Sequence, residues 1–525
     1  MMKKYAILFL FFLSVFILTA GGRIASSDET AFFLETQSLV DRGTLAIPDS
    51  IVHNGSYGTD GRFYVGGGIG YTLVSVPFYS AGKFFIGMLP VPESYHTFIL
   101  KGFFSLANQF ICALIGLLFF VFCRRLEYSS KISFFLTSAL LFSTNLFPYA
   151  KSSMREPLLT LCLLGAAYGL FAFKTERKVK HLHLAGFALF YLLNTKISYV
   201  VALPIFALYF ILIYDLQLFN PFRFRDLAVL FGNRMFWRHG SVLIFWIAAA
   251  CAVIGWINYM QFGNVFSSGY TGKPQPFNNP LVRGLFGLLL SPGKSFFLYA
   301  PVTILIFWSA VKWYRRYPKE AVFFALLFLV MLFLHAKYFA WAGDGSWGPR
   351  YLIPLLPFFV LPLGLLFQNS LEQRKKMYKF AALLLYGSGL LIQLGGTSVY
   401  LGSYLRYIGE YPYTKDFSDP EFLYKSRYEP AYSPVIGHWK LLGVSVQKHL
   451  NGEIGKIEIT DSQQRIPFSD PNTVIYLIDY WFMYMIYAGI KMVWILFMIS
   501  LSLSAAAAAG FGVYKVVVKA EGARG

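Results

Sequence analysis

The chain has 525 residues, of which 56% are hydrophobic and only 14% are charged. Its mean hydropathy of +0.54 excludes an ordinary soluble globular protein. The formal net charge of +20 would also suit a nucleic-acid-binding protein, but no motif of that kind occurs. Membrane topology, as described below, accounts for much of this charge, so no nucleic-acid partner is expected.

Hydrophobic segments recur along nearly the whole chain, and one membrane crossing needs about 20 apolar residues. The pattern predicts about twelve spans, near residues 5–20, 97–122, 132–148, 157–173, 182–195, 197–215, 241–258, 296–312, 321–335, 351–367, 380–397 and 488–514. The first segment, after Lys3 and Lys4, could also be a cleaved signal peptide, but the many later spans favour a retained helix. We therefore expect an all-α polytopic membrane protein.

Basic residues cluster in alternate connections between these spans. They are Lys3/Lys4, Arg124/Arg125/Lys131, Lys174/Arg177/Lys178/Lys180, Arg223/Arg225/Arg234/Arg238, Lys312/Arg315/Arg316/Lys319, Arg374/Lys375/Lys376/Lys379 and Lys515/Lys519/Arg524. The positive-inside bias places these connections and both termini in the cytoplasm, where they can also contact anionic membrane lipids. The long connections 21–96 and 398–487 then lie on the outer face.

Asp28 and Glu29 lie about eight residues beyond the first hydrophobic segment and are the strongest candidates for chemistry. Ionisable groups beside a bilayer are costly to desolvate and tend to serve function, although two solvated acids at a helix start would look the same in sequence. Because adjacent buried carboxylates repel each other, we expect one of the two to have a raised pKa.

Further charged residues fall on the same outer face. Arg155, Lys196 and Arg350 stand at the ends of predicted spans, where each could hold a lipid phosphate or simply extend to the interface. Secondary candidates on this face are Lys151, Glu156, Lys337, Asp344 and Tyr64. The mid-span positions are nearly all apolar, which argues against a transporter.

Cysteine usage and known motifs add little. Cys112, Cys123, Cys162 and Cys251 all lie in or at the ends of predicted spans, so they are expected to be small core residues rather than disulfides. There is no zinc-type Cys/His cluster, P-loop or Gly-x-Ser-x-Gly sequence, and Gly66 to Gly70 lacks the strand and helix of a dinucleotide site.

Several segments together resemble the GT-C superfamily of polytopic glycosyltransferases, most closely the bacterial relatives of protein O-mannosyltransferases and aminoarabinose transferases. The segments that carry the resemblance are Asp28-Glu29, Asp60 to Tyr64, Gly68 to Leu73 with Pro77 to Tyr79, Ala150 to Leu158, Leu193 to Lys196, Leu290 to Ser295 and Trp341 to Pro354. They cover roughly residues 1–360 in the family's order. Two features depart from the pattern: Asp344 interrupts an expected glycine pair, and residues 66–68 are glycines where relatives have larger side chains.

The resemblance implies an enzyme that moves a sugar from a polyprenyl-phosphate donor to an acceptor hydroxyl, with inversion, on the outer side of a bacterial inner membrane. Asp28 would be the general base, Glu29 would position it or the acceptor, and Arg155, Lys196 and Arg350 would bind the donor phosphate. The acceptor is left open between a glycan, a lipid and a protein. No cofactor is implied with certainty, because the acids could hold a divalent metal but this branch does not generally need one. A polysaccharide polymerase or ligase, or a lipid-linked saccharide transporter, is the alternative.

The expected organisation has three parts. Residues 1–397 form a GT-C-like transmembrane catalytic module with its first outer loop at 21–96, and 488–525 form the last span and a cytoplasmic tail. Between them, 398–487 is expected to be a small mixed α/β outer domain, with a strand at Ile454 to Thr460, that covers the site or contributes to acceptor binding. We also expect outer-face helices at the membrane surface.

Overall fold

The computed structural model describes residues 2–24, 26–49, 55–214, 230–272, 276–368, 374–416, 419–455 and 475–519. Within these ranges the helices are joined by turns and loops, and the strands form one small antiparallel hairpin, which pairs β1 (Gly55–Tyr57) with β2 (Phe63–Val65). A helix satisfies its own backbone hydrogen bonds, so it is the element that an apolar chain can place in a bilayer. The prediction of an all-α polytopic membrane protein is confirmed.

Seven helical segments are long and apolar enough to cross a membrane, judged by length and composition within the described residues. These are Glu93–Arg125, containing α4 (His96–Ser105) and α5 (Ala107–Arg125); α8 (Glu156–Glu176); α12 (Arg234–Phe262); α16 (Pro318–Lys337); Arg350–Gln368, containing α17 (Leu356–Val360) and α18 (Gly364–Gln368); Lys376–Ser398 within α19 (Arg374–Ser398); and α25 (Met492–Val513). Each matches one predicted span.

The other five predicted spans coincide with shorter or broken helices. They are α1 (Met2–Leu18); α6 (Ser130–Phe142) with α7 (Leu146–Ala150); α9 (Val179–Thr195); a 3-10 turn leading into α10 (Leu203–Ile213); and α14 (Phe296–Tyr299), which runs through a 3-10 turn into α15 (Ile306–Arg316). Pro301 follows the break after α14, where a proline cannot continue a helix's hydrogen bonds.

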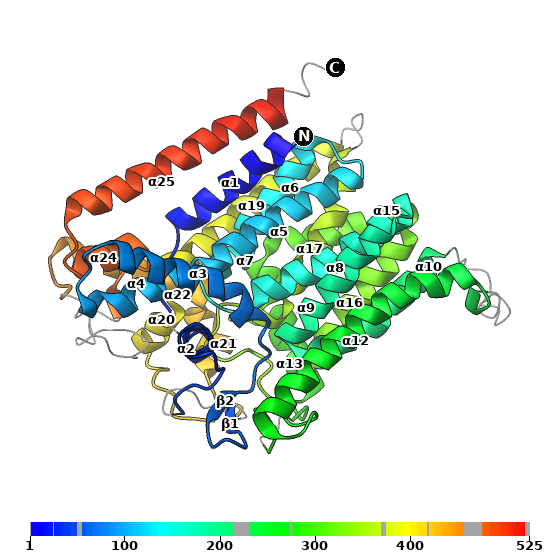
Figure 1. Ribbon diagram of the computed structural model, residues 1–525. Helices are drawn as coiled ribbons and strands as arrows, with labels where there is room; N and C mark the ends of the chain where they lie inside the picture. The colour runs from blue at the N-terminus through cyan, green and yellow to red at the C-terminus, as the bar shows by residue number, and fades with distance from the viewer. Residues whose placement is uncertain are drawn as a thin grey trace.

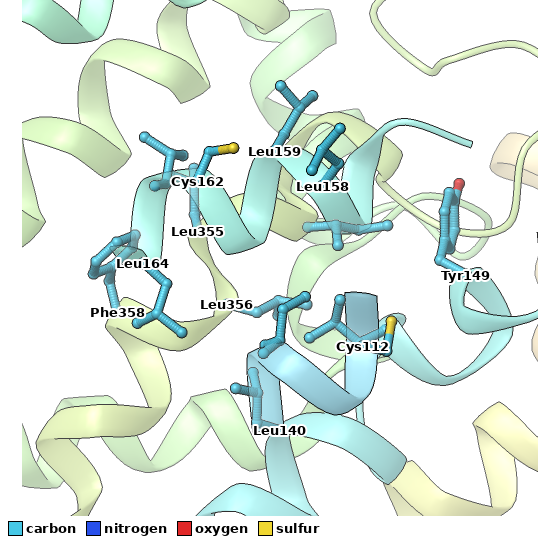
Figure 2. Close-up of a cluster of buried hydrophobic side chains, with 14 of the residues drawn as sticks. Cys112, Leu140, Tyr149, Leu158, Leu159, Cys162, Leu164, Leu355, Leu356 and Phe358 are labelled. Carbon is cyan, nitrogen blue, oxygen red and sulfur yellow. The ribbon is translucent and has the colours of Figure 1, made fainter. Parts of the chain in front are cut away.

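The core is built around α8. Its leucines and Cys162 pack against Leu355, Leu356 and Phe358 of the span that starts at Arg350 (Figure 2). Gly169 of α8 lies so close to α9 that an added Cβ would stand 2.8 Å from the Ala185 nitrogen, as is common where membrane helices pack tightly.

Helices α12 and α25 lie at the edges and expose most of their apolar side chains, as lipid-facing helices do. Cys112, Cys123 and Cys162 are buried and unpaired, but Cys251 on α12 is exposed, so the expectation that it is a core residue was wrong.

The helix ends that carry the described basic residues lie at one end of the bundle (Figure 1). There Arg125 pairs with Glu176 at 2.6 Å, Lys174 with Glu320 at 2.8 Å, and the Lys4 amine donates to Ser130 at 3.3 Å. The N-terminus and the far end of α25 lie at this end, whereas α2 (Ser27–Arg42), β1 and β2 lie at the other (Figure 1). The two faces predicted from charge are therefore physically separate ends.

The end that carries α2 and the hairpin also carries further helices that lie outside the spans. They are α2, α3 (Gly70–Met88), α13 (Leu281–Leu290), α20 (Leu401–Tyr407), α21 (Tyr424–Tyr428), α22 (Pro434–Leu450) and α24 (Trp481–Tyr487). The described part of 398–487 is helical, and α22 packs on α19. Most of the predicted strand at Ile454 to Thr460 falls outside the described residues.

Candidate active site

Asp28 is fixed by the start of α2. The Ser26 hydroxyl accepts a hydrogen bond from the Glu29 amide at 3.2 Å, and the Glu29 carboxylate accepts one from the Ser26 amide at 2.7 Å. This reciprocal pair is a capping box, encoded by a serine three residues before a glutamate. It starts the helix at Ser27 and so places Asp28 in the first turn.

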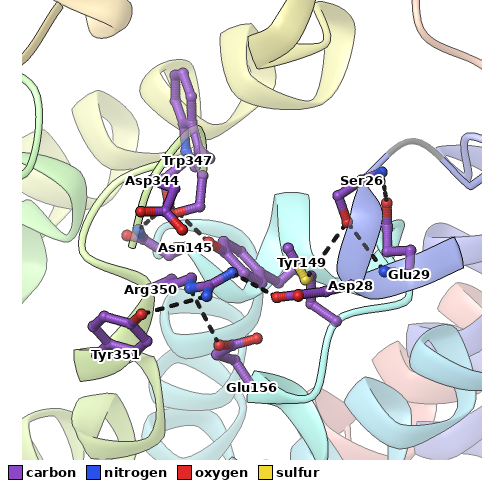
Figure 3. A network of polar contacts seen from close by, with 12 residues as sticks. Ser26, Asp28, Glu29, Asn145, Tyr149, Glu156, Asp344, Trp347, Arg350 and Tyr351 are labelled. Carbon is purple, nitrogen blue, oxygen red and sulfur yellow. Dashed lines mark hydrogen bonds and ion pairs between the residues drawn. The ribbon is translucent and has the colours of Figure 1, made fainter. Parts of the chain in front are cut away.

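Glu29 faces a different neighbour from Asp28. Its second carboxylate oxygen accepts from the Ser153 amide at 2.6 Å, which ties α2 to the turn between α7 and α8. Both carboxylate oxygens of Glu29 thus accept hydrogen bonds from backbone amides, whereas the Asp28 carboxylate points toward Arg350 (Figure 3).

Arg350 joins two carboxylates. Its Nη1 donates to Asp28 at 3.2 Å, its Nε lies 3.8 Å from Glu156, and its Nη2 donates to the Tyr351 hydroxyl at 3.4 Å (Figure 3). The other Glu156 oxygen is buried and has no hydrogen-bond partner among the described residues. Gly343, at φ +67°, makes room for this arginine, since an added Cβ would stand 2.7 Å from its Cγ.

Arg155 and Lys196 complete the group. The Arg155 guanidinium lies 5.0 Å from the Phe32 ring centre and donates to the Thr195 carbonyl at 3.4 Å. The Lys196 amine lies 4.5 Å from the ring centre of Tyr351. The structure therefore brings Asp28, Arg155, Lys196 and Arg350 together, from four segments distant in sequence.

The unusual glycines at 66–68 pack against this group. An added Cβ on Gly67 would stand 3.0 Å from Arg155 Nη1, and one on Gly68 would stand 2.1 Å from the Asn194 carbonyl oxygen. Larger residues would push the loop away from Arg155 and the turn before Lys196. The glycine run thus has a structural reason in this chain.

The charges set the protonation of the site. Burial alone would raise the pKa of Asp28, but Arg350 and Arg155 outweigh it and hold that pKa below its usual value. Burial, helped by Arg155, lowers the pKa of Lys196 to about 7. The pKa of Asp28 is therefore lowered, and not raised as one acid of the Asp28–Glu29 pair was expected to be. Instead, burial raises the pKa of Glu35, which accepts a hydrogen bond from Thr72, to about 7.

Two solved structures resemble this fold. One is ArnT from Cupriavidus metallidurans bound to undecaprenyl phosphate, with a TM-score of 0.42 and 12% identity over 97% of this chain and 77% of that one. The other is ArnT from the same organism in the apo state, with a TM-score of 0.43 and 12% identity over 97% and 75% of the two chains. No family model and no curated protein matches the chain.

Some of the secondary candidates lie with the Asp28 group and others do not. Glu156 belongs to the group, through Arg350. Asp344 lies nearby, and burial raises its pKa although Arg350 and Arg427 oppose the shift. Lys151 is turned to another partner, the buried Asp479, at 2.9 Å.

The remaining two candidates lie apart from Asp28 in their contacts. The Tyr64 hydroxyl donates to Asp60 at 2.7 Å, and its ring packs edge-on against Phe262. Lys337, at the end of α16, forms no ion pair within the described part of the chain; its carbonyl accepts from the Asn279 amide at 3.1 Å.

Sequence reasoning missed Tyr351 and the Asp479 cluster. Asp479 also pairs with Arg23 at 2.6 Å, so one carboxylate from the segment before α24 pairs with two cations, one after α1 and one after α7. Arg23 stands five residues before Asp28 and Asp479 is the lone acid in an aromatic stretch; nothing else in the sequence links them.

No group of three or more His, Cys, Asp or Glu side chains suited to a metal ion occurs in the ranges that the structure describes. Asp28 and Glu156 share Arg350 instead. The chemistry available to this site is therefore that of a carboxylate beside a triad of cations.

Proposed function

We propose that this protein is a membrane glycosyltransferase of the GT-C type that transfers a sugar from a polyprenyl-phosphate donor to an acceptor hydroxyl. The observation that carries the proposal is the pairing of Asp28 with Arg350 in a group that also holds Arg155 and Lys196. A phosphate at the membrane surface needs cations at helix ends, and an acceptor hydroxyl needs a base within reach.

The three cations would hold the donor phosphate. Arg155 and Arg350 offer planar guanidinium groups that match two phosphate oxygens, and Lys196 adds a point charge. Their charge favours departure of the lipid phosphate as the bond between the anomeric carbon and the phosphate oxygen breaks.

Asp28 would accept the proton of the acceptor hydroxyl while that oxygen bonds to the anomeric carbon. Its ion pair with Arg350 makes the free carboxylate a weak base. A phosphate bound to Arg350 competes for the guanidinium, weakens this pair and restores basicity to Asp28 when the donor is present. Attack opposite the phosphate inverts the anomeric centre.

The remaining parts of the proposal follow from the position of the site. Glu29 would position Asp28 by fixing the first turn of α2. The site would face the outside of a bacterial inner membrane, since it lies at the end of the bundle opposite the basic connections.

The test is a panel of radiolabelled polyprenyl-phosphate sugars offered to the purified protein in proteoliposomes, with a cell-envelope extract as acceptor. Transfer of label to the extract, and its loss in Arg350→Gln but not in the control Arg62→Gln, is the expected result. Arg62 is an exposed arginine paired only loosely with Asp60, at 3.8 Å. Movement of labelled saccharide across the bilayer without transfer would establish a transporter and overturn the proposal.

A further inference from the structure

A cavity of about 100 Å³ lies beside Asp28 and is used by none of the chemistry described above. Five segments line it: the link between α1 and α2 with the start of α2, α7 and the turn after it, the loop at 345–347, the end of α19 with the start of α20, and Asp479 before α24. On the scale where one water needs roughly 10–15 Å³, this space suits a single sugar ring rather than a folded peptide.

The cavity adjoins the start of α2, on a side away from Arg155, Lys196 and Arg350. Ser26, the N-cap of α2, and Glu29, in its first turn, both line it. Tyr149 also lines it, and the ring of Tyr149 lies next to Asp28 (Figure 3). In the described chain, none of Arg155, Lys196 and Arg350 lines it. A donor phosphate on those cations would leave the cavity free.

The walls combine aromatic faces with a nearly balanced set of charges. Tyr149, Trp347 and Tyr400 supply the rings, and Arg23 and Lys151 are paired there with Asp479. The Arg23 guanidinium lies 4.4 Å from the centre of the Tyr400 ring. Because Asp479 and Glu29 line the cavity together with these two cations, the cavity offers little net charge to a strongly anionic group.

This combination matches the chemistry of a neutral sugar. The C–H face of a sugar ring is weakly positive and packs on the negative face of an aromatic ring. Its hydroxyl groups exchange hydrogen bonds with charged side chains, which form stronger bonds than neutral partners do.

We propose that this cavity is the acceptor subsite and that the acceptor is a carbohydrate, whose terminal ring packs on Tyr400 and presents a hydroxyl to Asp28. The inference rests on the proposed function and names the acceptor that the function leaves open. It also gives the outer segment around Asp479 a role in building the acceptor site.

Tyr400 is the residue to change. Tyr149 donates to the Trp347 carbonyl at 3.2 Å, and Trp347 donates to Gln393 at 3.0 Å, so changing either ring also disturbs the fold. The test compares Tyr400→Ala with Tyr400→Trp, which keeps an aromatic face, and with Tyr407→Ala, an exposed tyrosine at the end of α20. The acceptors are a panel of neutral oligosaccharides and a serine-containing peptide.

Three quantities are measured with the donor that the panel above selects: acceptor KM, binding of polyprenyl phosphate, and slow transfer of the sugar to water. We expect Tyr400→Ala to raise the saccharide KM tenfold or more, with binding of polyprenyl phosphate and transfer to water unchanged. Tyr400→Trp and Tyr407→Ala should stay within about twofold of the wild type.

An unchanged saccharide KM in Tyr400→Ala, a parallel loss of polyprenyl-phosphate binding, or transfer to the peptide alone would overturn the acceptor subsite. Those outcomes leave the proposed function standing. A wild type that neither binds polyprenyl phosphate nor turns over any donor would instead refute the proposed function, and the subsite with it.

Discussion

Asp28 owes its position to hydrogen bonds made by its neighbours rather than by itself. Ser26 and Glu29 close the capping box, and Glu29 also holds the Ser153 amide. The two adjacent acids therefore have different partners: Glu29 binds backbone amides, and Asp28 pairs with Arg350. Two carboxylates that are adjacent in the sequence, such as Asp28 and Glu29, need not contact the same partners.

Lys196 gives the site a pH dependence. Its pKa of about 7 means that the free protein loses this charge as the pH rises through neutrality. Phosphate favours the charged amine, so binding takes up a proton. We expect the affinity for polyprenyl phosphate to fall above pH 7, approaching about tenfold for each further unit until the other cations carry the binding.

The check is a series of dissociation constants for polyprenyl phosphate across neutral pH, for the wild type and Lys196→Arg. Arginine stays charged throughout this range, so the variant should bind with little pH dependence. The same slope in both proteins would show that another group titrates.

At the scale of elements, the glycine run at residues 66–68 decides how closely the loop between β2 and α3 approaches the bundle. We expect Gly68→Ala to destabilise the protein by about 1–3 kcal/mol and to weaken polyprenyl-phosphate binding, because its Cβ would collide with the Asn194 carbonyl just before Lys196. Thermal unfolding in detergent and a binding titration measure the two effects.

Gly87→Ala is the matched control. Gly87 lies in α3, and an added Cβ there would meet nothing within 4 Å. Alanine favours a helix over glycine by about 1 kcal/mol, so this variant should be as stable as the wild type or more so. Equal behaviour of the two variants would contradict the role given to the glycine run.

The elements were more predictable than the site. Each of the twelve apolar segments coincides with a helix or a run of helices, because hydrophobic length alone requires it. The capping box is local, so Asp28 could also be anticipated. The Asp479 pairs with Arg23 and Lys151 join residues hundreds of positions apart, and charge type alone does not specify which partners meet.

Asp344 and Lys151 show the same limit within the candidate list. Both lie on the predicted face, yet Asp344 keeps one buried carboxylate oxygen unpaired among the described residues, and Lys151 is already paired with Asp479. The sequence predicts that both residues lie near the membrane surface. It does not show which of them lies near Asp28 and which forms an ion pair elsewhere, because that depends on how the helices pack.

For the whole molecule, the separation of charge between the two ends predicts its orientation. We expect a membrane-impermeant maleimide to label Tyr57→Cys, on β1, in intact cells, and Lys131→Cys, at the basic end, only in inverted vesicles. Both positions are exposed. The variants are made in a Cys251→Ser background, since Cys251 is the exposed cysteine of this chain's described part. The reversed labelling pattern would put the site in the cytoplasm.

The most direct measurement of the central claim is a single-turnover reaction with bound polyprenyl-phosphate sugar, comparing the wild type with Asp28→Asn. Asp41→Asn is the control, because Asp41 lies on the same helix but pairs with Lys83 at 2.6 Å. We expect Asp28→Asn to bind the donor and to release polyprenyl phosphate at least a hundredfold more slowly, the size of a general-base effect, with Asp41→Asn unchanged. Equal rates in the wild type and Asp28→Asn would remove Asp28 from the chemistry and contradict the account.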